Sequence, residues 1–289
     1  MNNSLIALFC IVDDFCQIFL PEWQKHLLTT GVKKRNRSGQ LTVSEIMTIY
    51  IYFHQSHYRD FKNYYINHVL IHFSDDFPKL VSYHRFVALT KSILIPMGIF
   101  MQMLTGKKTG LYFIDSTTID VCNIRREKQN KVFKGIAEKG KSSMGWVFGF
   151  KLHLVINDKG EIMAFKLTKS NVDDRTPVLQ LTKRLSGKLI GDKGYISQKL
   201  SDNLLNNGLQ LITKLKKNMK NKLMPVLDKL LLKKRAIIES VNDQLKNISQ
   251  IEHTRHRSIW NFLANILAGL IAYSLQPKKP SLNLKIELS

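Results

Sequence analysis

The stretch LYFID, at residues 111–115, places a carboxylate directly after four apolar residues. A short apolar run that follows the turn-forming residues 107–110 predicts a buried β-strand. A carboxylate at the end of such a strand lowers stability unless it is paired or used. Asp115 is therefore a candidate functional residue, although a turn cap beside Ser116 explains it better when it is considered alone.

The segments that follow this strand alternate between strand and helix patterns. Two apolar runs joined by a turn at residues 157–160 predict a β-hairpin. This order predicts an α/β fold, in which a mixed sheet carries flanking helices. The expected strands are 111–115, 146–156, 162–167, 188–191 and 209–214, the expected helices are 176–185 and 197–206, and helical structure returns from Asp228 onward.

A helical domain is expected before the sheet. Thr42 and Glu45 fit a capping box at the start of one helix. Ser82 starts a second helical stretch that runs to Leu94, and Pro96 should interrupt it just beyond. Basic and aromatic side chains mingle between the two helices, which suits contacts with DNA phosphates. We therefore assign residues 1–105 to a helical N-terminal domain that binds DNA, and residues 106–289 to the α/β domain with a helical C-terminal tail.

Two further carboxylates occupy places that stability alone explains poorly. Asp192 ends the strand expected at 188–191 and opens a glycine turn, for which a structural role is again the simpler explanation when it is considered alone. Glu239 lies at the edge of the buried face of a helix, in one stripe with Arg235 and Lys246. An Arg four residues before a Glu is the less favourable order, and such pairs contribute about 0.3–0.5 kcal/mol at best. A carboxylate between cations instead suits a helix that holds a metal ion beside DNA phosphates.

If these three carboxylates converge, they form an all-oxygen site. Oxygen ligands select Mg2+ or Mn2+ over zinc. Two such ions about 3.5–4 Å apart can activate the attacking oxygen and stabilise the leaving oxygen during displacement at phosphorus. Because clustered like charges repel, the site should be partly empty or distorted without metal.

The charge balance favours a polyanionic partner. The chain has 44 Lys and Arg residues against 22 Asp and Glu, a net charge of +22. Residues 1–110 contribute +5 and residues 111–289 contribute +17, so the candidate acids lie in the more basic part. Residues 214–235 hold nine Lys or Arg against Asp228 alone, which suggests a phosphate-binding rim. A loop expected at 125–141 carries Arg125, Arg126, Lys128, Lys131, Lys134, Lys139 and Lys141 against Glu127 and Glu138.

Cysteine usage and hydropathy favour a cytoplasmic protein. The three cysteines form neither a disulfide framework nor a CxxC pattern, which indicates a reducing compartment. No basic segment precedes the apolar run at residues 5–12, so it is not a secretory signal. The apolar stretch 262–275 has 14 residues, fewer than the roughly 20 needed to cross a bilayer. We therefore expect a core helix there and no membrane partner.

Four motifs occur in order within residues 111–246. They are FIDSTT at 113–118, GFKLHL at 149–154, GDKGY at 191–195, and the spacing Arg235-x3-Glu239-x6-Lys246. With these motifs the chain resembles insertion-sequence DDE transposases that have a ribonuclease H-like catalytic domain. EHTRHRS at 252–258 is similar to bacterial members of that family, and FPKLVSYHRF at 77–86 is more weakly similar to its helical leader.

The resemblance implies a DNA transposase that binds the inverted-repeat ends of its insertion sequence. It would catalyse metal-dependent 3′-end cleavage and strand transfer, and act as a homodimer on double-stranded DNA at the bacterial nucleoid. Asp115, Asp192 and Glu239 would be the catalytic ligands of two Mg2+ or Mn2+ ions. The residues expected to contact DNA are Arg235, Lys246, Lys193, Arg255 and Arg257.

The chain departs from many relatives at two points. A Tyr often stands three residues before the Arg of the last motif, and Leu232 holds that position here. The role of that Tyr in handling the DNA end is therefore either lost in this chain or replaced. Only 46 residues separate Asp192 from Glu239, which leaves no room for the large inserted domain of some relatives.

Two other functions stay open at this point. A tyrosine recombinase would use the cluster at 253–257 with Tyr273 as nucleophile, but His256 occupies the position of the Arg in the usual His-x-x-Arg element. A non-catalytic remnant would occupy the inverted repeats without cutting them, although the presence of all three acids argues against it.

Overall fold

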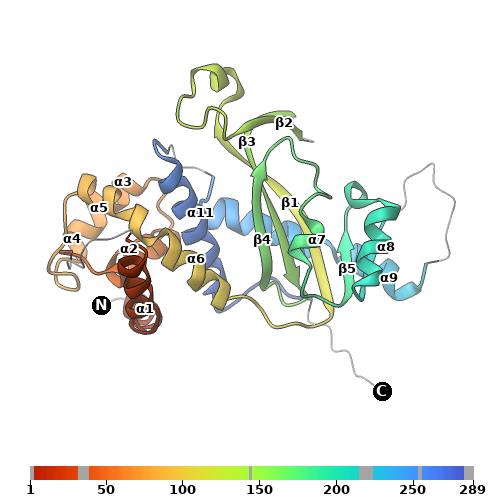
Figure 1. The fold of residues 1–289 in the computed structure, drawn as a ribbon, viewed down its shortest axis with the longest axis horizontal. Helices are drawn as coiled ribbons and strands as arrows, with labels where there is room; N and C mark the ends of the chain where they lie inside the picture. The colour runs from red at the N-terminus through yellow and green to blue at the C-terminus, as the bar shows by residue number, and fades with distance from the viewer. Residues whose placement is uncertain (1–2, 32–38, 143–144, 215–223, 253–255, 283–289) are drawn as a thin grey trace. The chain divides into compact units, whose positions relative to one another are not determined.

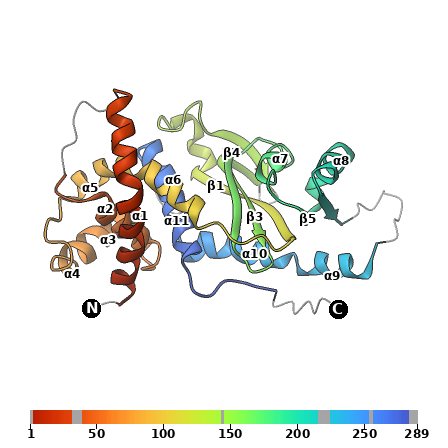
Figure 2. The ribbon, with the colours of Figure 1, turned by 60° about the horizontal axis from the view of Figure 1, so that its bottom comes forward.

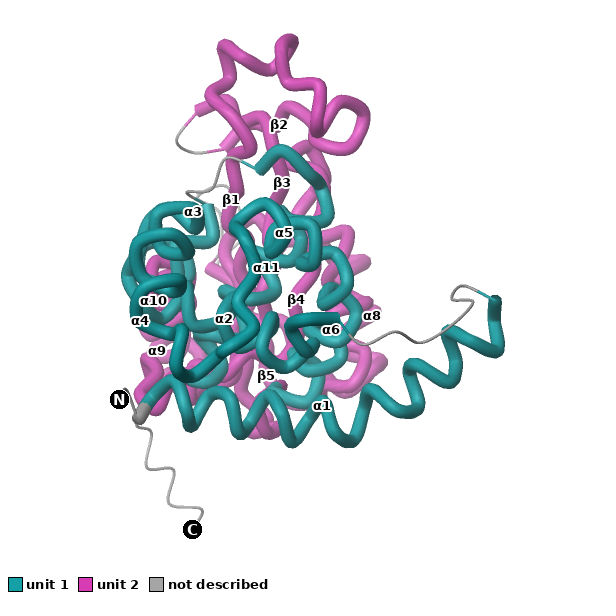
Figure 3. Tube along the Cα trace, turned by 90° about the vertical axis from the view of Figure 1, so that its left-hand side faces the viewer, with its two compact units in different colours: residues 1–104, 245–275 teal, residues 105–244, 276–289 magenta. Residues whose placement is uncertain are grey.

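The computed structural model describes residues 3–31, 39–142, 145–214, 224–252 and 256–282. The chain forms two compact units, coloured separately in Figure 3. We call Met1–Leu104 with Leu245–Leu275 the helical unit, and Thr105–Gln244 with Gln276–Ser289 the sheet unit. Residues 245–275 thus belong to the same compact unit as the N-terminal helices.

The helical unit begins with the long helix α1 and ends with α11. Its helix α2 starts with the expected capping box, in which Thr42 and Glu45 each accept a hydrogen bond from the other's backbone N–H. Helix α11 packs against α2 and α6. The helices are α1 (Asn3–Thr29), α2 (Val43–Phe53), α3 (Phe61–Tyr64), the π-helix η1 (Tyr65–Val69), α4 (Leu70–His72), α5 (Tyr83–Leu89), the 3-10 helix η2 (Thr90–Ile93), α6 (Leu94–Met103), the π-helix η5 (Gln244–Ile248, which starts on the last residue of the sheet unit) and α11 (Ile259–Ser274).

The sheet unit contains one mixed sheet. Its strands run in the order β4-β3-β1-β5-β6, with β2 beside the first residues of β3. The elements are β1 (Leu111–Cys122), the 3-10 helix η3 (Ile124–Gln129), β2 (Glu138–Ser142), β3 (Gly145–Asn157), β4 (Ile162–Lys169), α7 (Val178–Leu181), β5 (Gly187–Gly191), the 3-10 helix η4 (Lys193–Tyr195), α8 (Gln198–Asn206), β6 (Leu209–Thr213), α9 (Val226–Lys234) and α10 (Ala236–Asp243) (Figure 1).

The strand directions confirm the expected fold class. Strands β1, β3 and β4 are antiparallel neighbours, whereas β5 and β6 run parallel to β1. The sheet is therefore ribonuclease H-like: it has three antiparallel strands, then two strands parallel to β1, and helices on both faces. The expected hairpin is confirmed as β3 and β4, and the strand predicted at 188–191 is β5.

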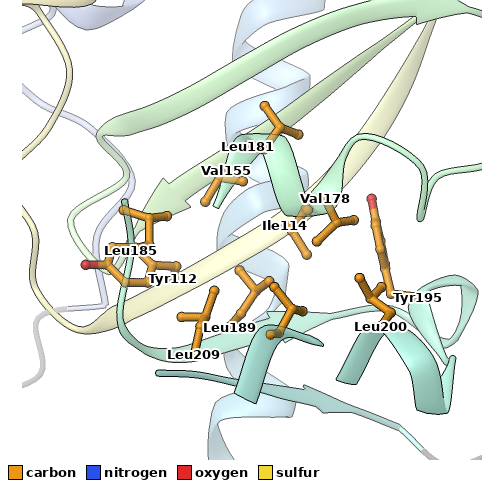
Figure 4. Close-up of a cluster of buried hydrophobic side chains, with 11 residues drawn as sticks. Tyr112, Ile114, Val155, Val178, Leu181, Leu185, Leu189, Tyr195, Leu200 and Leu209 are labelled. Carbon is orange, nitrogen blue, oxygen red and sulfur yellow. The ribbon is translucent and has the colours of Figure 1, made fainter. Parts of the chain in front are cut away.

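Helices cover both faces of this sheet. Apolar side chains of α7 and α8, such as Val178 and Leu200, pack on Ile114 of β1 and Leu189 of β5 (Figure 4). Helix α10 packs on β1, and α9 packs on β5 and β6, from the opposite side (Figure 2). Because side chains alternate along a strand, Asp115 faces α10 while its neighbour Ile114 faces α7 and α8.

Several local expectations were wrong. The predicted helix at 176–185 has only one turn, α7, and the basic loop predicted at 125–141 contains η3 and β2. Strand β1 continues seven residues beyond Asp115, because its polar residues pair with β3. Pro96 does not interrupt a helix, since it lies in the first turn of α6, where its missing N–H breaks no helical hydrogen bond.

Two helical stretches are long and apolar enough to cross a membrane by composition alone. They are Ser4–Thr29 and Tyr83–Met103, with mean hydropathy of 1.7 and 1.5. A core helix has the same composition, and the second stretch contains the 3-10 turn η2, so this observation is weak evidence for a span.

Gly149 allows the close approach of β1 to β3. A Cβ atom at this position would lie 2.1 Å from the carbonyl oxygen of Ile119. We expect Gly149→Ala to lower the free energy of unfolding by about 1–3 kcal/mol, since backbone must move to admit the methyl group. Urea unfolding measures the change. Gly98→Ala is the matched control, because no atom lies within 4 Å of the added methyl, and it should be neutral or stabilising. Equal losses in both variants would contradict this explanation.

Candidate functional site

Asp115 is held on β1 by two side chains from one helical face. Asn242 of α10 donates a hydrogen bond through Nδ2 to Asp115 Oδ2, at 3.2 Å. The guanidinium of Arg235, at the start of α10, lies 3.8 Å from Asp115 Oδ1. The carboxylate is 23% exposed, so it lies at the rim of the packed sheet. This carboxylate is fixed in position and still reachable from solvent.

Asp192 lies at the end of the neighbouring parallel strand. The register pairs Phe113 of β1 with Ile190 of β5, so two residues further along both strands the same alignment leads to Asp115 and Asp192. The exposed Asp192 follows β5 and precedes η4, and its carbonyl oxygen accepts a hydrogen bond from the backbone N–H of Tyr195 at 3.1 Å. Adjacent parallel strands thus bring these two carboxylates to neighbouring positions, where β5 ends beside β1.

Glu239 lies on α10, the helix that packs on β1. The helix is anchored by Ile238 and Val241, which are fully buried, whereas the Glu239 side chain is 57% exposed. Arg235, one helical turn earlier, forms a short ion pair with its carboxylate. Glu239 is therefore a surface carboxylate whose position is held by the ion pair with Arg235.

Arg235 joins two of the three acids. Its side chain is only 16% exposed, and it contacts both Asp115 and Glu239. Within the described residues, its Nη1 and the Oδ1 of Asn242 are buried atoms without a hydrogen-bond partner. The site therefore has unused donor and acceptor capacity beside the paired charges.

The pKa of Asp115 reflects its burial and the charges around it. Burial raises this pKa from 3.8 to about 6, which Arg235 and the backbone N–H of Ser116 partly oppose. The charges of Glu239 and Asp192 make smaller contributions to this rise. Two of the predicted acids, Asp192 and Glu239, therefore lie near enough to influence the third, Asp115.

The donor chemistry of these residues fits a hard divalent cation. Carboxylate oxygens, together with the free amide oxygen of Asn242, are ligands that Mg2+ and Mn2+ accept. In the part of the chain that the structure describes, however, no three acidic, His or Cys side chains stand close enough together to hold an ion. In this arrangement it is Arg235 that neutralises Asp115 and Glu239.

A second polar network, which the sequence did not predict, lies on the face of β1 opposite to Asp115. Asp174 accepts hydrogen bonds from Ser116 Oγ at 2.9 Å and from Lys151 Nζ at 3.0 Å. His153, next on that face of β3, bonds Thr168 through Nε2, and burial lowers its pKa to about 4. The available signal was the alternation of Lys151 and His153 in GFKLHL, because alternate residues share one face of a strand. The network ties the strand segment that carries Asp115 to the loop after β4.

The cations expected to contact DNA have different surroundings. Lys193 is exposed in η4, directly after Asp192. Lys246 belongs to the helical unit, where it pairs with Glu252 at 3.1 Å. Arg257 is exposed in the same unit, and Arg255 lies outside the described residues. Arg235 pairs with Asp115 and Glu239.

Leu232 and Tyr273 are both buried. Leu232 of α9 is 6% exposed, so the residue at the position of the missing Tyr packs as an apolar side chain. Tyr273 of α11 is completely buried. A nucleophile must meet its substrate, so this burial argues against the tyrosine-recombinase interpretation.

Comparison with known proteins gives two matches. The family model described as "Transposase DDE domain" matches residues 105–259. A cryo-EM structure of a piggyBac transposase synaptic complex with hairpin DNA has a TM-score of 0.48 and 9% sequence identity, covering 93% of this chain and 74% of that chain. At that score and identity, the likeness transfers neither residue roles nor activity. No curated protein matches the chain.

The raised pKa of Asp115 predicts that this residue lowers stability near neutral pH. Its folded pKa of about 6 exceeds the unfolded value of 3.8, so its contribution is lost as pH rises from about 4 through about 6. In the absence of divalent ions, Asp115→Asn should be more stable than wild type by about 1–3 kcal/mol at about pH 7, and nearly equal at about pH 4. Urea unfolding in EDTA measures this difference. A less stable variant at neutral pH would show that the pairing with Arg235 outweighs burial.

Proposed function

Because the chain belongs to the transposase DDE domain family, we propose that it is a metal-dependent transposase acting on the ends of its own insertion sequence. It would bind the terminal inverted repeats, use water to release a 3′-hydroxyl, and join that hydroxyl to a target phosphodiester. No covalent protein–DNA intermediate is needed. The observation that carries the proposal lies within the matched residues: Arg235 contacts both Asp115 and Glu239, and the charges of Glu239 and Asp192 raise the pKa of Asp115.

The three carboxylates would hold the divalent ions. A bound Mg2+ or Mn2+ pair supplies a more acidic water and stabilises negative charge on the oxygens at phosphorus. Asp115 is best placed to set the geometry of the site, because Asn242 and the strand fix it. Asp192 and Glu239, which are exposed, can adjust around the ions.

The cations near these acids would position the DNA backbone. Lys193 is exposed directly beside Asp192, and the exposed Lys233 and Lys234 end α9, six and five residues before Glu239. A strongly basic chain attracts double-stranded DNA, and each phosphate contact releases counterions, so binding weakens with salt. A homodimer could hold the two DNA ends of the element together with a target. Access to chromosomal DNA favours a cytoplasmic location at the nucleoid.

Replacement of each acid by its amide tests the catalytic assignment. Asp115→Asn, Asp192→Asn and Glu239→Gln should each reduce 3′-end cleavage about a thousandfold or more, because each removes a charged metal ligand. Binding of the same duplex in EDTA should stay within a few fold of wild type. The assay follows Mg2+-dependent cleavage of a labelled duplex that carries the DNA flanking the gene.

Asp202→Asn is the matched control, since Asp202 is an exposed acid of α8. It should cleave as wild type does. Cleavage retained in all three acid variants would refute the assignment. A wild-type protein that binds the ends but never nicks them with Mg2+ or Mn2+ would support the non-catalytic remnant instead.

A further inference from the structure

Trp146 is an exposed aromatic residue on a two-stranded ribbon at one end of the sheet. Its side chain is 57% exposed, at the start of β3. The pairing of β3 with β1 ends at Phe148, and Trp146 pairs with Lys141 of β2. Figure 1 shows β2 beside β3 at this end of the sheet. The indole of Trp146 therefore contributes little buried apolar surface to the sheet core.

The chain around this tryptophan is strongly basic. All seven cations of residues 125–141 are exposed, against the two half-buried carboxylates of Glu127 and Glu138. Lys139 Nζ lies 5.2 Å from the centroid of the Trp146 ring and 3.8 Å from Glu127. We call residues 125–141 together with Trp146 the basic ribbon. A cation beside an exposed ring suits a partner that offers both phosphates and flat aromatic faces.

We propose that the basic ribbon is a DNA-binding surface on which Trp146 stacks against a base that has left the duplex stack. Its cations would hold the backbone on either side of that base. The proposal rests on DNA being the substrate, as in the proposed function, but it assigns a surface that the three acids do not require. Stacking of a base on an aromatic side chain contributes about 1–3 kcal/mol.

Equilibrium binding in EDTA tests this surface separately from catalysis. The probe is a duplex with a short single-stranded extension, compared with the same duplex fully paired. Trp146→Ala should weaken binding of the extended probe about 5- to 100-fold and change the paired probe less. Trp146→Phe should restore most of the affinity, because the ring face is kept.

Trp260→Ala is the matched control. Trp260 is 47% exposed and lies under Lys91 Nζ at 5.1 Å, in the helical unit. It should leave the preference for the extended probe unchanged. Equal affinity of Trp146→Ala and wild type for both probes would overturn the surface, whatever the acid variants show. A wild-type protein that binds neither probe would reject the proposed function as well.

A different observation concerns Arg235, which contacts two of the acids proposed to bind metal. An Arg guanidinium has the charge and the oxygen affinity to stand in the place of a cation. It is largely buried, in contact with Asp115 and Glu239 together. Arg235 and a divalent ion would therefore compete for the carboxylates of Asp115 and Glu239.

We infer that Arg235 is an internal counter-ion that a divalent ion must displace from Glu239 and Asp115. Asn242 would keep Asp115 in place during the exchange, because its hydrogen bond does not involve Arg235. The displaced guanidinium would then be able to bind a DNA phosphate. This inference also rests on the proposed function, since it presumes that the acids bind metal.

Binding of Mn2+ alone, without DNA, tests the exchange. Arg235→Gln should tighten Mn2+ binding about 3- to 10-fold in a titration followed by the signal of free Mn2+, because the competing charge is gone. Lys234→Gln, which removes an exposed charge from the same helical segment, should change it much less. Equal effects of the two variants, or weaker binding in Arg235→Gln, would overturn the inference. Absence of Mn2+ binding in wild type and both variants would instead reject the metal site itself.

Discussion

A carboxylate held at the rim of an apolar sheet is the constraint on which the sheet unit depends. Ile114 packs into the core below α7 and α8, and the next residue, Asp115, projects toward α10. Burial of a charge is unfavourable unless it is compensated. Here Arg235 and Asn242 supply the compensation, so α10 must stay packed on β1 for the acid to be tolerated.

Sequence pattern was sufficient for the elements that local interactions specify. The capping box at Thr42 and Glu45, the β3–β4 hairpin and the strand that contains Ile190 all follow from spacing within a few residues. The pattern failed where distant partners decide the structure. Strand β2 forms because β3 offers it an edge, and the helix expected at 176–185 has a single turn packed into the sheet core.

The candidate site shows the same division. The three acids were selected from the sequence because each follows or interrupts an apolar segment in which a charge is unexpected, and their role as metal ligands stays a prediction. Asp174 could not be selected in this way, since its role depends on Ser116 and Lys151, which lie far from it in the chain. Arg235 was expected to face DNA, and its contact with Asp115 needs the packing of α10 on β1, which helical spacing alone does not reveal.

The assignment of α11 to the helical unit has a consequence for biosynthesis. The ribosome makes α1 to α6 first, then every strand of the sheet, and α11 only afterwards. Ile266, Leu270 and Tyr273 of α11 complete the interior of the first-made unit. The apolar surface of the N-terminal helices that α11 buries therefore stays exposed while the strands of the sheet are synthesised. A nascent chain with this order depends on its later-made part to finish its earlier one.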